Sequence, residues 1–193
     1  KRHFESIYNY KKKKYSIHVI DKSNFALKKI KKNIKLLNNN LIFENNYNNL
    51  DPFYDLVIIS TNSFEREKII DTLLKKITFN FVILEKIVFQ KIKSYDKYIK
   101  IFDQKKIKCW VNCPRRTYNS YINLKRYIKK NDNLIMFISG GNWNLASNFV
   151  HFTDLFCFLT NSTNLKVDIF NVDKKIIKSK RKGYVEFNGL IIL

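Results

Sequence analysis

Apolar runs and helix-forming segments alternate over residues 3–111, and this alternation limits the possible folds more than any other feature of the chain. Residues 56–59 and 81–84 are continuous apolar runs of the kind found in strands that are buried on both faces of a sheet. Residues 23–37 instead carry apolar side chains at every third or fourth position, which is typical of a helix. This order of strand, helix and strand predicts right-handed βαβ units in a doubly wound, Rossmann-type parallel α/β sheet.

The expected elements follow from the same two periodicities. Strands are predicted at 16–20, 41–43, 56–59, 81–84 and 107–111, and helices at 3–10, 23–37, 64–76 and 94–104. Beyond a break at Pro114, we expect a helix at 117–129, a strand at 133–139, a helix at 143–159, a strand at 165–172 and a strand pair around Gly189. Residues 1–114 are therefore predicted to form a Rossmann-type domain, and residues 115–193 the start of an α+β domain.

The charge of the chain admits a nucleic-acid partner but does not require one. Its 37 Lys and Arg residues against 16 Asp and Glu residues give a net charge of +21, and such a basic chain can bind nucleic acid. However, the lysines are spread along the whole chain among many Asn, Ile, Phe and Tyr residues, all of which have A/T-rich codons. We therefore interpret the charge as codon bias on a solvated surface, with nucleic-acid binding as the alternative.

Neither a membrane span nor a disulfide framework is expected. No apolar run approaches the roughly 20 residues of a transmembrane helix, and residues 1–5 lack the apolar core of a signal peptide. Cys109, Cys113 and Cys157 are odd in number and have no repeated spacing, so we expect buried free thiols in a reducing cytoplasm. The pair at 109 and 113 is too small for a zinc site, and no metal is expected.

Polar residues follow four of the predicted strands, at the edge where open α/β sheets bind their ligands. They are Asp21, the run Ser60, Thr61 and Asn62, the pair Glu85 and Lys86, and the run 112–116. Asp21 can accept hydrogen bonds from both ribose hydroxyls of a dinucleotide, although an N-cap for the next helix is an equally natural role. Lys86 can donate to a substrate oxygen while Glu85 holds it in place; the alternative is an exposed ion pair in a loop.

A line of polar residues crosses the otherwise apolar helix predicted at 143–159. Asn144, Ser147, Asn148, His151 and Asp154 recur about one helical turn apart, so they lie on one face. Such a face usually borders a wetted crevice or a buried polar network. His151 is at its centre and can exchange a proton near neutral pH; alternatively it is a structural core residue bonded to Ser147.

Four stretches of the chain resemble the Gfo/Idh/MocA family, the glucose–fructose oxidoreductase and inositol dehydrogenase group of NAD(P)-dependent sugar enzymes. Residues 1–5 resemble the stretch that follows the family's GxGxxG loop, and residues 55–62 resemble its fourth strand and Thr-Pro turn. Residues 82–86 resemble the strand that ends in Glu-Lys-Pro. The segment from Gly140-Gly141 to His151 and Asp154 resembles the helix that carries the family's catalytic histidine.

The chain departs from the family pattern in several places. Its four glycines lie at or after Gly140, so relative to the family the GxGxxG loop and the first strand are missing, and the second domain is cut short. Three positions carry a different residue: Ile87 for the proline after Glu-Lys, Asn62 for the proline of the Thr-Pro turn, and Arg66 where a histidine is frequent. Ser147 stands where the family has an aspartate four residues before the histidine, so Asn148 or Asp154 would have to partner His151.

The resemblance implies hydride transfer between a nicotinamide cofactor, NAD or NADP, and a hydroxyl-bearing carbon of a sugar, sugar derivative or nucleotide sugar. His151 would take the hydroxyl proton, and Lys86 would hydrogen-bond the reacting oxygen. Asp21 favours NAD because a carboxylate repels a 2′-phosphate. The other implied contacts are Ser60, Thr61, Asn62 and Glu85 to the cofactor, and Arg116, Tyr118, Asn148 and Asp154 to the substrate. A homo-oligomer is implied as well, and a non-catalytic or regulatory homologue is the alternative.

Overall fold

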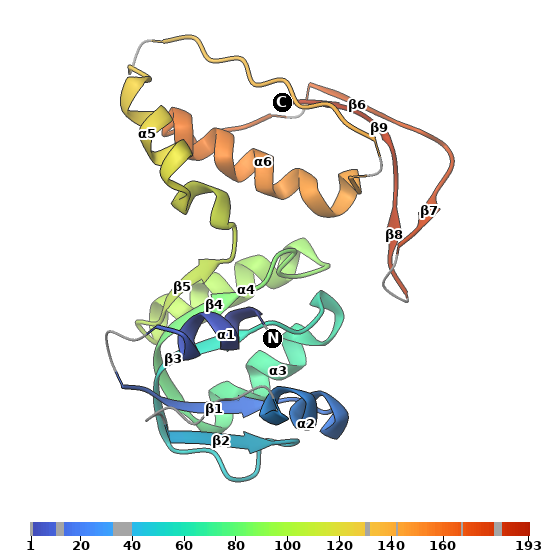
Figure 1. Ribbon diagram of the computed structural model, residues 1–193. Helices are drawn as coiled ribbons and strands as arrows, with labels where there is room; N and C mark the ends of the chain where they lie inside the picture. Colours follow the sequence, from blue (N-terminus) through green and yellow to red (C-terminus); the bar gives the residue numbers. More distant parts are fainter. Residues whose placement is uncertain are drawn as a thin grey trace.

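The computed structural model describes residues 2–10, 14–32, 40–129, 132–141, 143–166, 168–179 and 183–193 (Figure 1). The elements up to β5 form one α/β group, and the elements after it gather around α6 (Figure 1). Across these ranges, no helix combines the length and the apolar character that a membrane crossing needs.

Alternating strands and helices make up the first group, as the apolar pattern predicted. In chain order they are α1 (Arg2–Tyr8), β1 (Ser16–Ile20), α2 (Asn24–Lys32), β2 (Asn40–Glu44), β3 (Phe53–Ile59), α3 (Ser63–Lys76), β4 (Thr78–Leu84), α4 (Ile92–Gln104) and β5 (Lys108–Val111). Each strand and helix predicted before Pro114 is present, with ends that differ by a few residues. The last part of the second predicted helix, at 33–37, lies outside the described residues.

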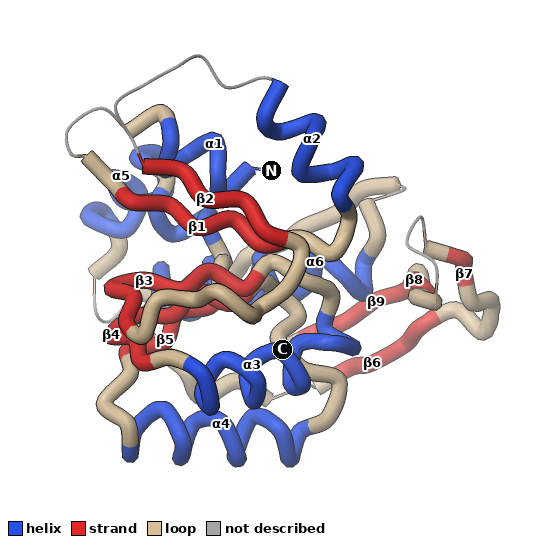
Figure 2. Tube along the Cα trace, turned by 90° about the horizontal axis from the view of Figure 1, so that it is seen from below, coloured by secondary structure: helices blue, strands red, loops and turns tan. Residues whose placement is uncertain are grey.

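These five strands pair in parallel, but they form two sheets rather than the one continuous sheet that was expected. β1 pairs with β2, from Ser16 opposite Asn40 to Ile20 opposite Glu44. β3, β4 and β5 form the second sheet with β4 in the centre. Among the described strands, no ladder joins β1 to β3, although these two strands are neighbours (Figure 2). The fold is therefore mixed α/β with a parallel three-stranded sheet flanked by helices, which is compatible with a Rossmann-like arrangement.

The main core lies between the three-stranded sheet and helices α3 and α4. Val82 and Leu84 on β4, Ile70 on α3 and Tyr98 on α4 are each no more than 1% exposed. β4 is buried because it has a strand on each side and helices packed against it. This packing fixes the carboxyl end of β4, from which the candidate site begins.

After β5 the chain forms η1 (Pro114–Thr117), α5 (Asn119–Tyr127) and α6 (Leu145–Thr160). Two antiparallel strand pairs follow, β6 (Ile169–Val172) with β9 (Gly189–Ile192) and β7 (Ile177–Lys178) with β8 (Val185–Glu186). The Arg115 guanidinium lies 4.3 Å from the centre of the Phe152 ring, and the Lys125 ammonium lies 4.2 Å from that of Phe158. These contacts pack η1 and α5 against α6. The helix predicted at 117–129 is present as α5, which is about two residues shorter at each end, and the strand predicted from 165 begins at Ile169.

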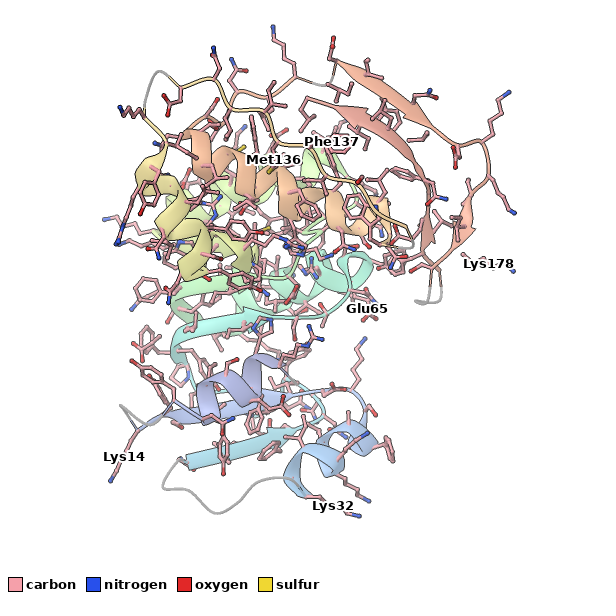
Figure 3. The ribbon with its side chains drawn as sticks, turned by 45° about the horizontal axis from the view of Figure 1, so that its top comes forward. Lys14, Lys32, Glu65, Met136, Phe137 and Lys178 are labelled. Atoms are coloured by element: carbon pink, nitrogen blue, oxygen red, sulfur yellow. The ribbon has the colours of Figure 1, made fainter. Side chains whose placement is uncertain are left out.

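The prediction of a strand at 133–139 is wrong, because residues 132–140 have no regular secondary structure. Their burial nevertheless alternates: Leu134, Met136 and Ile138 are half-buried, whereas Ile135 and Phe137 are 92% and 84% exposed. The segment that carries Met136 and Phe137 runs alongside α6 (Figure 3). The burial of this segment therefore alternates because every second side chain faces α6. Within the described part of the molecule the segment has no partner strand.

Candidate functional site

A buried arginine organises the loop after β4. Arg66 lies on the inner face of α3 and is 1% exposed. Its Nη1 atom donates to three carbonyl oxygens, those of Glu85, Ile87 and Val88, at 2.6, 2.6 and 2.7 Å. Its Nη2 atom donates to the carbonyl oxygen of Thr61, in the loop after β3. One guanidinium therefore holds both loops together and positions Lys86, which lies between two of the acceptors and is joined to Ile87 by a cis peptide bond.

Lys86 reaches from the end of β4 to α6. Its Nζ atom donates to the carbonyl oxygen of Ser147, in the first turn of that helix. His151 lies one turn further along. Desolvation lowers the pKa of His151 below its ordinary value, and the nearby charges of Lys86 and Arg115 lower it further. The structure thus brings together the two residues that were predicted to be catalytic.

The imidazole of His151 lacks the partners that were predicted for it. Its Nδ1 atom is buried and has no hydrogen-bond partner within the described ranges. The side-chain amide of Asn148 donates to the carbonyl oxygens of Trp143 and Asn144, the latter at 3.3 Å. Asp154 is paired with a different side chain, an arginine of η1. The prediction that Asn148 or Asp154 orients the imidazole is therefore wrong.

A buried carboxylate that sequence reasoning missed holds the start of α6. Glu186 on β8 is 5% exposed, and its Oε2 atom accepts a hydrogen bond from the backbone N–H of Ser147 at 3.2 Å. A carboxylate at the amino end of a helix satisfies an N–H group that has no intrahelical acceptor. Because Lys86 binds the carbonyl of the same residue, two side chains from outside α6 fix its first turn. A single glutamate in a two-residue strand has no periodic signal that would reveal this role.

Two of the predicted substrate contacts bind each other. The Nε atom of Arg116 donates to one carboxylate oxygen of Asp154 at 2.9 Å, and its Nη2 atom donates to the other. This hydrogen bonding raises the pKa of Arg116. The pair docks η1 onto α6 in a strong two-point geometry, so a substrate would have to compete with it. Tyr118 is 50% exposed and stacks on Tyr121, with ring centres 6.3 Å apart.

Among the predicted cofactor contacts, Asp21, Ser60 and Asn62 are exposed, whereas Thr61 is half-buried. Asp21 is exposed, and its Oδ1 atom accepts the backbone N–H of Ser23 at 2.8 Å. The Ser23 hydroxyl in turn accepts the N–H of Ala26 at 3.2 Å, so Ser23 rather than Asp21 caps α2. The hydroxyl of Thr61 is buried and has no hydrogen-bond partner in the part of the chain described. A buried hydroxyl of this kind at the carboxyl end of a strand is a position where a bound ligand can donate or accept.

Asn62 and Glu85 also make structural contacts. Asn62 is the N-cap of α3, where its side-chain oxygen accepts the N–H of Glu65 at 3.1 Å. The Oε1 atom of Glu85 accepts a hydrogen bond from Asn112 at 2.7 Å and lies 2.6 Å from Nε2 of His3. Burial acts to raise the pKa of Glu85, but its hydrogen bonds to Asn112 and His3 hold that pKa below the ordinary value. Glu85 therefore ties α1 and the end of β5 to the end of β4.

The three cysteines are free, as predicted, but only Cys113 is buried. Cys157 is half-buried, and the expectation of a buried thiol is wrong for the exposed Cys109, because β5 lies at the edge of its sheet. Desolvation, with a smaller contribution from the Asp154 charge, raises the pKa of Cys113 to about 11. A thiol this basic is a poor nucleophile at neutral pH.

Cys113 is expected to react slowly with iodoacetamide in the folded chain. At pH 8 a thiol with a pKa of about 11 is roughly 0.1% ionised, whereas an ordinary cysteine is about a quarter ionised. Alkylation should therefore be about 200-fold slower than in the urea-unfolded chain, as followed by peptide mass spectrometry. Equal rates in the two states would show that the thiol is not desolvated and would make Cys113 a candidate nucleophile.

No protein-family model matches the chain, and no curated protein matches its sequence at a significant level. A function for the chain therefore has to be argued from the geometry of these residues.

Proposed function

We propose that this chain is part of an NAD(P)-dependent oxidoreductase that transfers a hydride between a nicotinamide and a hydroxyl-bearing carbon of a sugar, sugar derivative or nucleotide sugar. The observation that carries this proposal is that Lys86, at the carboxyl edge of the β3–β4–β5 sheet, binds the backbone of α6 at Ser147, one turn before His151, and that its charge lowers the pKa of His151. This edge is where open α/β sheets bind their ligands. Oxidation of an alcohol needs a base for the hydroxyl proton and a donor for the reacting oxygen, and these two side chains supply both.

The charges of the two residues suit these roles. Because the pKa of His151 is lowered, its imidazole is neutral at pH 7 and can accept the hydroxyl proton. The Lys86 ammonium binds the carbonyl of Ser147, and in the proposed reaction it would hydrogen-bond the substrate oxygen and stabilise its developing negative charge. In the opposite direction His151 returns the proton to the alkoxide. A bound nicotinamide would supply or accept the hydride.

Three residues that follow β1 and β3 fit a dinucleotide in part. Asp21 presents an exposed carboxylate after β1, which suits the two ribose hydroxyls and favours NAD over NADP. Thr61 offers its buried hydroxyl after β3, and Ser60 is exposed beside it. These three residues would hold the cofactor, while Asn62 and Glu85 would shape the loops around it.

Nucleotide binding is tested by thermal unfolding of the 193-residue chain and of the chain lengthened by any residues that its gene encodes before Lys1. At 100 times its Kd, a ligand adds about 2.7 kcal/mol to the free energy of unfolding. For a chain of this size that is a rise in Tm of about 5–10 °C. We expect this shift with NADH and a smaller one with NADPH, because of Asp21. If neither nucleotide raises the Tm of either form while both are folded, the proposed oxidoreductase is wrong.

A non-catalytic nucleotide-binding homologue is the second candidate, and one observation favours it. The Nδ1 atom of His151 has no hydrogen-bond partner among the described residues, whereas a general base is normally oriented by a third group. A homologue of this kind would be stabilised by the nucleotide but would not turn over any member of a panel of sugars and nucleotide sugars. Nicotinamide absorbance, followed with each substrate, therefore separates the two candidates.

A further inference from the structure

β1 and β3 are neighbours that share no hydrogen-bond ladder, so within the described structure each has one edge without a partner strand (Figure 2). Side chains join the two strands at two levels. The hydroxyl of Tyr54, near the start of β3, lies 2.8 Å from Nδ1 of His18 in β1. Lys22, just after β1, binds Glu65, in the first turn of the helix α3 that follows β3, at 2.8 Å. The two strands therefore run side by side in the same direction.

A cleft lies between these two strands, and we call it the strand slot. Apolar side chains of β1, β3 and α3 line it, among them Ile20, Leu56, Val57 and Ile69, and polar groups line it as well, among them His18, Tyr54, Ser60 and Thr61. A cleft of this kind, bounded by two unpaired strand edges, offers both hydrophobic surface and main-chain donors and acceptors.

The strands beside the slot are less buried than their apolar sequence leads one to expect. Val82 in β4, which has a strand on each side, is 0% exposed. By contrast, none of the five described residues of β1 is buried, and in β3 Ile59 is buried while Leu56 is 40% exposed. A continuous apolar run such as 56–59 is typical of a strand with neighbours on both sides. The strands beside the slot thus lack the burial of the central strand β4, as does the edge strand β5, all of whose residues are exposed.

We propose that the strand slot binds one extended apolar segment of the protein's own polypeptide, which runs parallel to β1 and β3, hydrogen-bonds to both and leads into α1. Filling the slot joins the two sheets in the order β2-β1-slot-β3-β4-β5, which is the doubly wound order 3-2-1-4-5-6 with the slot as position 1. A parallel strand there ends at the carboxyl edge. α1 begins at the same edge, because Glu85 holds His3 at 2.6 Å, so the connection is short.

A peptide added in trans tests the slot without any nucleotide. The probe is a fluorescent peptide with about six Val and Ala residues, the length of a typical strand, and Glu residues at both ends to suit the net charge of +21. The control is the same peptide with alternate backbone nitrogens methylated, which has the same charge but cannot pair with two edges. We expect the probe to bind at least about tenfold more tightly than the control in fluorescence anisotropy.

Hydrogen exchange shows where the probe binds. The amides of Ser16–Ile20 and Phe53–Ile59 should become protected together. The outer edges of the two sheets, at β2 and β5, should not change. Protection at β2 or β5 instead, or equal binding of the methylated peptide, would overturn the proposal, because the probe would then be adding to any open edge or binding through its charge.

Two matched variants and one longer chain complete the test. Leu56→Lys puts a charge into the slot and should weaken probe binding by at least about tenfold. Phe53→Lys makes the same change on the same strand, at a residue that is 47% exposed and does not line the slot, and should leave binding within about twofold.

The chain lengthened by residues encoded before Lys1 should no longer bind the probe, because its own segment fills the slot. A lengthened chain that binds the probe as before would show that the occupant is not the segment leading into α1.

Discussion

Replacing Arg66 with methionine is expected to lower the free energy of unfolding by about 3 kcal/mol. The guanidinium is 1% exposed and supplies hydrogen bonds to four main-chain carbonyl oxygens, three of them through one nitrogen. Methionine has a similar length and fills much of the same space, so the main loss is in hydrogen bonding. Each buried carbonyl left without a donor costs about 1–3 kcal/mol, offset in part because a buried charge is removed.

The measurement is urea or thermal unfolding of the two chains, where a loss of this size lowers the Tm by about 6–12 °C. Arg126→Met is the matched control, because Arg126 on α5 is exposed and makes one long hydrogen bond, to Asn123 at 3.4 Å. That control should stay within about 0.5 kcal/mol of the parent chain. An Arg66→Met chain as stable as the control would mean that the carbonyl contacts contribute nothing to folding.

Arg66 also shows how a structural role can be visible in a sequence. The buried residues of α3 are Ser63, Arg66, Ile69, Ile70 and Leu73, which share one face of the helix at steps of three and four. A cation on that face has to find buried acceptors, because an unpaired charge in a core is costly. The loops after β3 and β4 supply them. The helical period alone could therefore have placed Arg66 among the residues that shape the site.

Local patterns predicted the elements well and their long-range pairing less well. The apolar runs located β3 and β4, and the helical periods located α3 and α4, because burial against neighbours sets both patterns. The same patterns could not show that the β1–β2 and β3–β4–β5 sheets are separate, since strand pairing depends on residues far apart in the chain. The error at 133–139 has the same origin. An alternating apolar pattern shows that one side of the segment is buried and the other exposed, but it does not show that the segment pairs with another strand.

The candidate site divides in the same way. Lys86 and His151 could be predicted because each stands in a distinctive local context, a buried strand end and a polar line on an apolar helix. The pairing of Arg116 with Asp154, and the contact of Glu186 with Ser147, could not. Both contacts join segments that are brought together by the packing of α6 against η1 and β8. The sequence around a single charged residue does not indicate which residue it will bind.

Replacing His151 with alanine is expected to lower kcat for alcohol oxidation by about 10²–10⁴, in the form of the protein that binds nucleotide. The imidazole is neutral at pH 7 because desolvation, then Lys86 and Arg115, lower its pKa. Activity should therefore be constant at neutral pH and fall only as the pH drops through a pKa below the ordinary value of 6.5.

Thr153→Ala is the control on the same helix, since Thr153 bonds the carbonyl of Phe149 within α6. It should change kcat by less than about threefold, and a similarly small loss in His151→Ala would remove His151 as the base.

A double-mutant cycle with Lys86 separates a catalytic pair from two residues that merely support the same helix. Lys86→Ala alone should also lower kcat by about 10²–10³, through loss of a donor to the developing oxyanion. If both side chains act on one proton transfer, the double variant should be little slower than the worse single variant, because catalytic residues that act as a unit are strongly non-additive. If instead Lys86 acts by holding the carbonyl of Ser147, its loss should lower the Tm and the two effects on kcat should multiply. Additive losses together with a lower Tm would therefore assign Lys86 to the support of α6 and leave His151 as the sole acid–base group.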